Sequence, residues 1–327
     1  MTALIVNNNK EDKQYEHLDY IDIGKGILIL LVVIGHIFPE SLFKCWIYGF
    51  HVQAFFILSG IVTNHSRTFC AASKRLLLRR KVLTTIKEVV IFEMGGVIGH
   101  IIRFGFRQKI VGIIFDTITL RFNNVANWYM IAMLIANILL YVCLELSKAG
   151  LTILGFISFC IAVIVPSNHF YTVLSWGLIA FFAMIIGRLY EKQLHNVGSN
   201  IVYIPLALIF TIIAVHFNGR ISIYDHALGN PIWVLISSIS GAILVIGISI
   251  RIKDYFIARL LRLIGVNSLY IMGFHLPVNN LLIRICGVGG DSLIYSIVAL
   301  PCIILLIIIT RKIISQLVLS KISRNHT

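Results

Sequence analysis

Residues 21–39 read IDIGKGILILLVVIGHIFP, a run that is apolar enough to cross a lipid bilayer as a helix. The run nevertheless carries an aspartate, a lysine and a histidine. An ionisable group at hydrocarbon depth costs roughly 2.5–3.5 kcal/mol on insertion scales, so each one is a functional candidate by default. Lys25 and His36 lie close to three helical turns apart, so they share one face with a rise of about 16 Å between them. This combination indicates a membrane enzyme or a membrane translocator.

The composition of the whole chain agrees with a membrane location. Of the 327 residues, 58% are hydrophobic and only 13% are charged, which a soluble domain with an ordinary surface does not need. We therefore predict an all-α, polytopic integral membrane protein with about ten transmembrane helices. A further stretch, 109–122, is interrupted by Asp116 and Arg121 and is expected to be re-entrant or interfacial. The ten apolar windows are 22–39, 43–63, 82–102, 127–146, 151–165, 171–188, 201–217, 231–250, 263–283 and 291–310.

The basic residues of the chain fit a membrane topology better than a nucleic-acid surface. The net charge is +14, yet the 28 lysines and arginines recur between apolar windows and do not form one patch. With both termini in the cytoplasm, 19 of the 28 fall on the cytoplasmic side, as the positive-inside rule requires. The expected parts are a polar cytoplasmic tail (1–21), a transmembrane domain (22–319) and a cytoplasmic C-terminal tail (320–327).

Neither a leader segment nor a metal site is indicated. The first twenty residues lack a basic n-region and a small-residue cleavage site, so we expect no signal peptide and a retained first helix. The six cysteines are scattered, without a CxxC pair or a His/Cys spacing typical of metal ligands. We therefore expect no bound metal and no disulfide framework.

A basic cluster lies before the third apolar window. It consists of Lys74, Arg75, Arg79, Arg80 and Lys81. Such a cluster suits phosphate binding, because arginine pairs with phosphate through two hydrogen bonds and lysine acts as a point charge. Clusters of this kind also orient membrane proteins and contact anionic lipids. Both interpretations stay open at this point.

Other polar residues in apolar windows are candidates for chemistry or for packing. His51 lies near the start of the second window, on the same side as His36. Glu93 shares a helix face with His100 and is either a relay or substrate-binding acid, or a buried acid paired for packing. Trp128 lies where interfacial aromatic residues are also found for anchoring alone. In the ninth window, one stripe carries Ser268, Met272, His275 and Asn279, which is either functional or a hydrogen-bonded packing motif, and Pro277 is expected to bend this helix.

Several of these segments together resemble acyltransferase family 3, and in particular its fucose-acetylase-like and polysaccharide O-acetyltransferase branch. They occur in the family's order over nearly the whole chain. The segments are DIGKGILILLVVIGH (22–36), FHVQAFFILSG (50–60), the basic loop before the third window, NWYM (127–130), FFAMIIG (181–187) and LIGVNSLYIMGFH (263–275).

The resemblance implies a role for each matching residue. His36, which closes the first helix, matches the catalytic histidine, and Lys25 stands where the family often has an arginine. The basic motif of the third helix handles acetyl-CoA in the family, which implies that Arg75, Arg79 and Arg80 bind the acyl donor with Lys25. Thr84 and Thr85 stand near the place where that motif commonly has a proline, so its register differs here. The residues expected to line the acceptor site are His51, Glu93, Trp128, Ser268 and His275.

We therefore expect an integral membrane O-acetyltransferase of the cytoplasmic (inner) membrane. It would move an acetyl group from cytosolic acetyl-CoA to a hydroxyl of a cell-surface polysaccharide or lipid-linked sugar, with no bound cofactor and no nucleic-acid partner. His36 would act as a general base, because the ordinary pKa of histidine is near 6.5, or as a nucleophile that carries the acetyl group. The alternatives are a transporter or flippase for a glycan precursor, and a membrane sensor or scaffold without chemistry. Stabilisation by acetyl-CoA would separate the enzyme from both.

Overall fold

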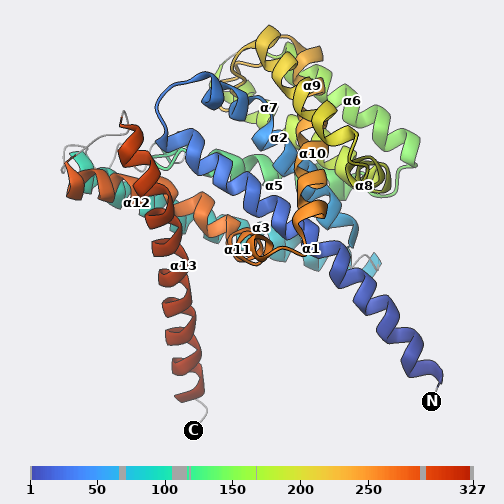
Figure 1. Ribbon diagram of the computed structural model, residues 1–327, viewed down its shortest axis with the longest axis horizontal. Helices are drawn as coiled ribbons and strands as arrows, with labels where there is room; N and C mark the ends of the chain where they lie inside the picture. Colours follow the sequence, from blue (N-terminus) through green and yellow to red (C-terminus); the bar gives the residue numbers. More distant parts are fainter. Residues whose placement is uncertain are drawn as a thin grey trace.

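The computed structural model describes residues 2–65, 71–104, 116–117, 119–166, 168–287 and 292–324. Over these residues the chain is α-helical, with one isolated bridge between Ser222 and Ala227 as its only β pairing (Figure 1). The all-α class expected from the sequence is confirmed. Most of the interfacial stretch expected at 109–122 lies outside the described residues.

Twelve helices account for most of the described structure. The helices are α1 (Thr2–Ile37), α2 (Leu42–His65), α3 (Ala71–Phe104), α5 (Asn127–Val142), α6 (Lys148–Ile164), α7 (His169–Leu189), α8 (Glu191–Ser199), α9 (Tyr203–Asn218), α10 (Pro231–Ile252), α11 (Phe256–Val266), α12 (Ser268–Cys286) and α13 (Leu293–Arg324).

Among the described residues, six helical segments are long and apolar enough to cross a membrane, or seven if the bent pair α8–α9 forms one span. The expected number of about ten is therefore not confirmed. Helices α5 and α6 are apolar but have only 16 and 17 residues, fewer than the roughly 20 that a bilayer requires. Helix α3 carries Lys87, Glu88 and Glu93 within its apolar part. The six segments are Asp19–Ile37, Leu42–Thr63, His169–Leu189, Pro231–Ile252, Ser268–Cys286 and Leu293–Ile313.

Helix α1 runs through the middle of the bundle and contacts α2, α10, α11, α12 and α13 (Figure 1). Its span is buried along most of its length, and Ile21, Leu28, Ile29 and Val33 are inaccessible to solvent. The N-terminal part of α1 and the C-terminal part of α13 project from the same side of the bundle, so both chain ends lie at the lower edge of the view. Residues placed along α1 are therefore held at fixed depths inside the protein.

Two helix crossings depend on glycines that bring backbones into direct contact. A Cβ atom on Gly26 of α1 would lie 2.1 Å from the carbonyl oxygen of Leu261, and one on Gly265 of α11 would lie 1.8 Å from that of Asp22. In the same way, a Cβ on Gly187 of α7 would lie 1.9 Å from the carbonyl oxygen of Ile57 in α2. Small residues permit such close approach of membrane helices, so these glycines fix the separation of α1 from α11 and of α2 from α7.

The window expected as one span at 263–283 is divided in two. Helix α11 ends at Val266 and α12 begins at Ser268, with Asn267 between them at φ −95° and ψ 3°. The guanidinium of Arg311 in α13 lies 4.3 Å from the ring centre of Tyr270 and donates hydrogen bonds to Asn267 Oδ1 and to the carbonyl of Val266. The Val266 carbonyl at the break thus has a charged partner, and the polar stripe of α12 starts one turn inside the expected span.

Candidate active site

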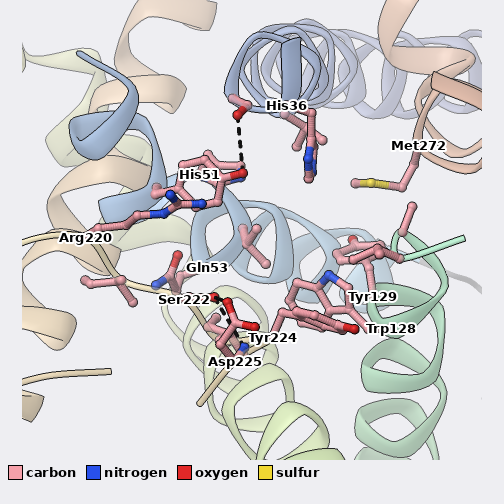
Figure 2. A pocket seen from close by; sticks show the side chains of 18 of the residues that line it. His36, His51, Gln53, Trp128, Tyr129, Arg220, Ser222, Tyr224, Asp225 and Met272 are labelled. Atoms are coloured by element: carbon pink, nitrogen blue, oxygen red, sulfur yellow. Dashed lines mark hydrogen bonds between the residues drawn. The ribbon is translucent and has the colours of Figure 1, made fainter. Parts of the chain in front are cut away.

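One cavity of about 270 Å³ lies at the C-terminal end of the α1 span (Figure 2). We call it the His36 cavity. Its walls come from α1, α2, α5, the loop 219–230 between α9 and α10, and one side chain of α12. The residues that line it are Val32, Gly35, His36, Lys44, Tyr48, His51, Val52, Gln53, Val125, Ala126, Trp128, Tyr129, Arg220, Ile221, Ser222, Ile223, Tyr224, Asp225 and Met272.

His36 projects into this cavity from the end of α1, and Figure 2 shows its ring above the other lining side chains. His36 lies at the C-terminal end of the α1 span, where it keeps accessible surface and lines the cavity. The ring of His275 lies beside it, with 5.0 Å between the two ring centres. Tyr48 lies on another side of His36, at 6.3 Å between ring centres. His36 is therefore held among aromatic rings with a surface open to a bound molecule.

Backbone carbonyls orient the other two histidines. Nδ1 of His51 lies 2.7 Å from the carbonyl oxygen of Ile47, and Nδ1 of His275 lies 2.8 Å from that of Met272. A carbonyl can only accept a hydrogen bond, so Nδ1 must carry the proton in each ring, which leaves Nε2 as the acceptor in the neutral form. Nε2 of His275 is buried and has no hydrogen-bond partner among the described residues.

The loop 219–230 closes the cavity opposite α1. It turns back on itself through the Ser222–Ala227 bridge and through His226, whose φ is 56°. The guanidinium of Arg220 lies 4.1 Å from the ring centre of Tyr48. Glu40 lies 3.4 Å from Arg220 Nη1 and 2.8 Å from Lys44 Nζ, and the hydrogen bond from Lys44 lowers the pKa of Glu40. These contacts fix the loop against the start of α2.

Two aromatic rings, Trp128 and Tyr224, form one wall of the cavity, and Trp176 packs behind them. Trp176 stacks on Tyr224 with 5.6 Å between ring centres and 18° between ring planes. Its indole also donates a hydrogen bond of 3.2 Å to the Tyr224 carbonyl. Trp128 lies 5.7 Å from Trp176 and 6.3 Å from Tyr224. Trp176 is buried behind the wall, so it holds the two rings that reach the cavity, Trp128 and Tyr224.

A second cavity, of about 480 Å³, lies toward the N-terminal end of the α1 span. We call it the Lys25 cavity. Lys25 Nζ lies 3.2 Å from Asp22 Oδ1 within it, and Lys81 of α3 donates a hydrogen bond to Asn137 of α5. The residues that line it are Asp22, Lys25, Phe55, Ser59, Lys81, Thr85, Tyr129, Met130, Met133, Asn137, Gly265, Val266, Ser268, Leu269 and Met272.

Among the residues that the structure describes, only Tyr129 and Met272 belong to the walls of both cavities. Both side chains are buried, and the Tyr129 ring stacks on Phe56 with 5.0 Å between ring centres and 2° between planes. We call this pair the septum. The two cavities therefore lie in series along α1, with His36 on one side of the septum and Lys25 on the other.

The structure divides the site residues expected from the sequence among several places. His36, His51 and Trp128 line the His36 cavity, whereas Lys25 and Ser268 line the Lys25 cavity. His275 lines neither, but lies against His36. The side chain of Arg75 lies outside the described part of the structure, and Arg79 and Arg80 are exposed on α3 without lining either cavity.

Glu93 has a different setting from the one expected, because it lines neither cavity. Its carboxylate accepts hydrogen bonds from the backbone N–H groups of Asn123 and Asn124, at 2.7 and 3.1 Å. The side chains of Asn123 and Asn127 donate further bonds to it, both at 2.9 Å. Glu93 thus ties the segment before α5 to α3, which fixes Trp128 and Tyr129 relative to the bundle.

Several lining residues were not expected from the sequence, above all Gln53 and the loop residues Arg220, Tyr224 and Asp225. A signal was present, because GRISIYDHALGN (219–230) is a polar loop with both signs of charge between two apolar windows. Gln53 likewise interrupts the aromatic run of the second window. Neither signal says which loop folds back over His36, since that depends on how α9 and α10 pack.

Comparison with known protein families places the chain at the family level. Residues 18–312, most of the chain, match the model of a family described as an acyltransferase domain. No curated protein and no solved structure gives a significant match. Within the described residues, no group of three or more His, Cys, Asp or Glu side chains could hold a metal ion.

Proposed function

Because the chain belongs to acyltransferase family 3, we propose that this multi-pass membrane acyltransferase is an O-acetyltransferase. It takes the acetyl group from cytosolic acetyl-CoA and transfers it to a hydroxyl of a cell-surface polysaccharide or lipid-linked sugar. The enzyme would act in the cytoplasmic membrane, with both chain termini on the cytoplasmic side.

The observation that carries this proposal is the pair of cavities separated by the septum. A donor in the cytoplasm and an acceptor on the other face must enter from opposite directions, which requires two sites that meet deep in the membrane. The Lys25 cavity and the His36 cavity fit this requirement, since among the described residues Tyr129 and Met272 are the two that line both. A transporter needs a passage that opens along its length, whereas a transferase needs contact at one point.

The Lys25 cavity suits the donor. It holds two lysines, Lys25 and Lys81, and it is lined by α3 close to the basic cluster that contains Arg79 and Arg80. Positive side chains bind the phosphate groups of a nucleotide through charge-assisted hydrogen bonds. We place the phosphate end of acetyl-CoA near this cluster, with the thioester arm pointing along the cavity toward the septum.

The His36 cavity suits the acceptor and the chemistry. The acceptor oxygen forms a bond to the acetyl carbonyl carbon while His36 takes the hydroxyl proton as general base. The carbon–sulfur bond then breaks, coenzyme A leaves as a thiolate, and the proton passes to that sulfur. Acetyl-CoA and an alcohol thus give an acetyl ester and coenzyme A with a free thiol. In the alternative sequence, a nitrogen of His36 first attacks the carbonyl and expels the thiolate, and the hydroxyl then attacks the acetyl-imidazole.

The test is the acetyl ester content of surface glycans in three strains: one with the wild-type gene, one with the gene deleted, and one that produces His36→Ala at the same membrane level. We expect loss of the ester in the deletion and His36→Ala strains. His216→Ala is the matched control, because His216 is exposed and lines neither cavity. Unchanged esters with altered glycan export would replace the proposal by the transporter alternative.

Purified protein provides a second test. Acetyl-CoA is expected to raise its thermal stability, because a ligand that binds only the folded state stabilises it by mass action. His36→Ala should keep this effect, since His36 lies on the far side of the septum from the Lys25 cavity. Absence of stabilisation in the wild type would contradict the donor assignment.

A further inference from the structure

The side chain of Gln53 has hydrogen-bonding groups that the protein leaves unused. Gln53 lies on α2 in the wall of the His36 cavity and is 2% exposed. Neither its Nε2 nor its Oε1 has a hydrogen-bond partner among the described residues. Buried polar groups are nearly always paired, so each exception calls for an explanation. Figure 2 shows Gln53 at the side of the cavity where Arg220, Ser222 and Asp225 also lie.

The amide of Gln53 is suited to a hydroxyl-bearing ligand. An amide has hydrogen-bond donors on nitrogen and an acceptor on oxygen. A hydroxyl group can pair with either, because it both donates and accepts. A carboxylate or phosphate oxygen at neutral pH only accepts, so it would leave Oε1 of Gln53 buried without a donor. The unused amide therefore favours neutral hydroxyl groups over anionic ones.

The charged side chains that line the same cavity already have partners. The ammonium of Lys44 lies 2.8 Å from Glu40 and donates a bond of 3.2 Å to the carbonyl of Phe38. Arg220 lies 3.4 Å from Glu40, and Asp225 accepts a bond of 2.6 Å from Ser222. Both cations thus share the Glu40 carboxylate, and Asp225 is bonded to a serine hydroxyl. An anionic ligand would meet cations that are already paired, and it would also meet the negative charge of Asp225.

The aromatic wall provides the remaining part of the site. Trp128 and Tyr224 reach the cavity and are held from behind by Trp176. A sugar ring has an apolar face of C–H groups, which can pack on such rings while its hydroxyl groups point toward polar side chains. The cavity of about 270 Å³ is slightly smaller than the roughly 300–1,000 Å³ of typical small-molecule sites, so it suits one sugar ring and no more.

We infer that the His36 cavity binds the acceptor as one neutral sugar ring, with Gln53 hydrogen-bonded to its hydroxyl groups and its apolar face on Trp128 and Tyr224. The inference rests on the proposed function and adds to it the class of sugar. Uronic acids and sugar phosphates are excluded as the ring that receives the acetyl group.

The first experiment compares methyl glycosides of neutral hexoses with the matching methyl uronosides and hexose 6-phosphates, using purified protein and acetyl-CoA. Ester formation is measured by mass spectrometry. We expect at least a tenfold preference in kcat/KM for a neutral glycoside. Equal rates or preference for an anionic glycoside would overturn the inference while leaving the proposed function intact.

If the enzyme accepts no free glycoside, the test is made on surface glycans from cells. The sugar that carries an acetyl ester in cells with the gene, and lacks it in the deletion strain, then identifies the acceptor as neutral or acidic. An ester on an acidic sugar overturns the inference, whereas absence of any gene-dependent ester contradicts the proposed function itself.

The second experiment tests Gln53. Gln53→Leu is expected to raise KM for the neutral acceptor about tenfold, with KM for acetyl-CoA unchanged. Its thermal stability should be unchanged or higher, because the substitution removes buried polar atoms that have no partner. Gln193→Leu is the matched control, since Gln193 is exposed on α8 and lines neither cavity. A loss of stability without a change in acceptor KM would make Gln53 a structural residue and overturn its assigned role.

Discussion

The three histidines near the site differ in what their ring nitrogens can do. His51 and His275 each use Nδ1 to donate to a backbone carbonyl, which fixes the ring and leaves Nε2 as an acceptor. His36 faces the cavity directly and packs beside His275 at 5.0 Å between ring centres. Of the three, His36 and His51 line the cavity and can touch an acceptor, whereas His275 lies behind His36 and is placed to position it.

Lys25 is expected to act on the donor alone. Lys25→Ala should raise KM for acetyl-CoA about tenfold, because a hydrogen bond to a charged group contributes about 1.5–3 kcal/mol. KM for the acceptor should stay the same, since Lys25 lies across the septum from His36. Steady-state kinetics with each substrate varied in turn measure both values.

Asp22→Asn tests the same prediction, with a change in KM for acetyl-CoA expected in the opposite direction. Asp22 Oδ1 lies 3.2 Å from Lys25 Nζ, so its neutralisation frees the ammonium and should lower KM for acetyl-CoA. Lys25→Arg should keep near-normal kinetics. If both KM values are unchanged in Lys25→Ala, Lys25 serves only as an anchor in the membrane.

At the level of residues, the sequence predicted part of the lining of the His36 cavity but not the contacts that support it. His36, His51 and Trp128 were expected together and do line one cavity. Their segments also carry the family resemblance, which the match over residues 18–312 confirms. Glu93 was expected at the site because it shares a helix face with His100. Helix periodicity places a side chain on a face, but it does not reveal that four N–H groups from residues 123–127 lie against that face.

Helix crossings hold the two cavities at their depths, and the crossing of α2 and α7 can be tested directly. Gly187→Ala is expected to destabilise the protein by about 1–3 kcal/mol, as overpacking does in cores. Its Cβ would lie 1.9 Å from the carbonyl oxygen of Ile57, and backbone atoms of α2 cannot move aside alone. Thermal unfolding of detergent-purified protein measures the change.

Gly150→Ala is the control for this crossing. The nearest atom to a Cβ on Gly150 is Ser147 Oγ at 3.4 Å, an ordinary contact, and alanine is the better helix former by about 0.5–1 kcal/mol. Gly150→Ala should therefore be neutral or stabilising. Equal stability of the two variants would mean that the α2–α7 separation tolerates a methyl group.

At the level of helices, apolar windows predicted most elements but could not locate every break. The division at Asn267 falls inside a continuous apolar window, because Arg311 from α13 compensates the interrupted backbone. That partner lies 44 residues further along the chain, so no local pattern signals it. Similarly, α5 and α6 look like spans by composition, but the structure ends them after 16 and 17 residues.

Across the whole molecule, the septum is expected to keep water on the acceptor side away from the thioester. Met272→Ala removes one of the two side chains shared by the cavities. We expect severalfold faster hydrolysis of acetyl-CoA in the absence of acceptor, because exclusion of water is what prevents such side reactions. Release of free thiol from purified protein measures this rate.

Met272→Leu is the matched variant, since a swap of similar volume preserves packing. It should keep slow hydrolysis and normal acetyl transfer. If Met272→Ala loses acetyl transfer with no gain in acetyl-CoA hydrolysis, Met272 positions a substrate and does not keep water from the thioester. Other residues must then separate the two cavities.

The position of the septum between the two cavities also determines whether a membrane potential can affect the reaction. In the proposed reaction, an acetyl group would pass outward across the septum while the acceptor's proton passes inward to the sulfur, so the exchange would move no net charge. A membrane potential, worth about 2.3 kcal/mol per charge per 100 mV, would therefore neither drive nor oppose that reaction. The thioester bond would then be its sole energy source, and we expect acetylation to continue in a de-energised membrane for as long as the donor is supplied.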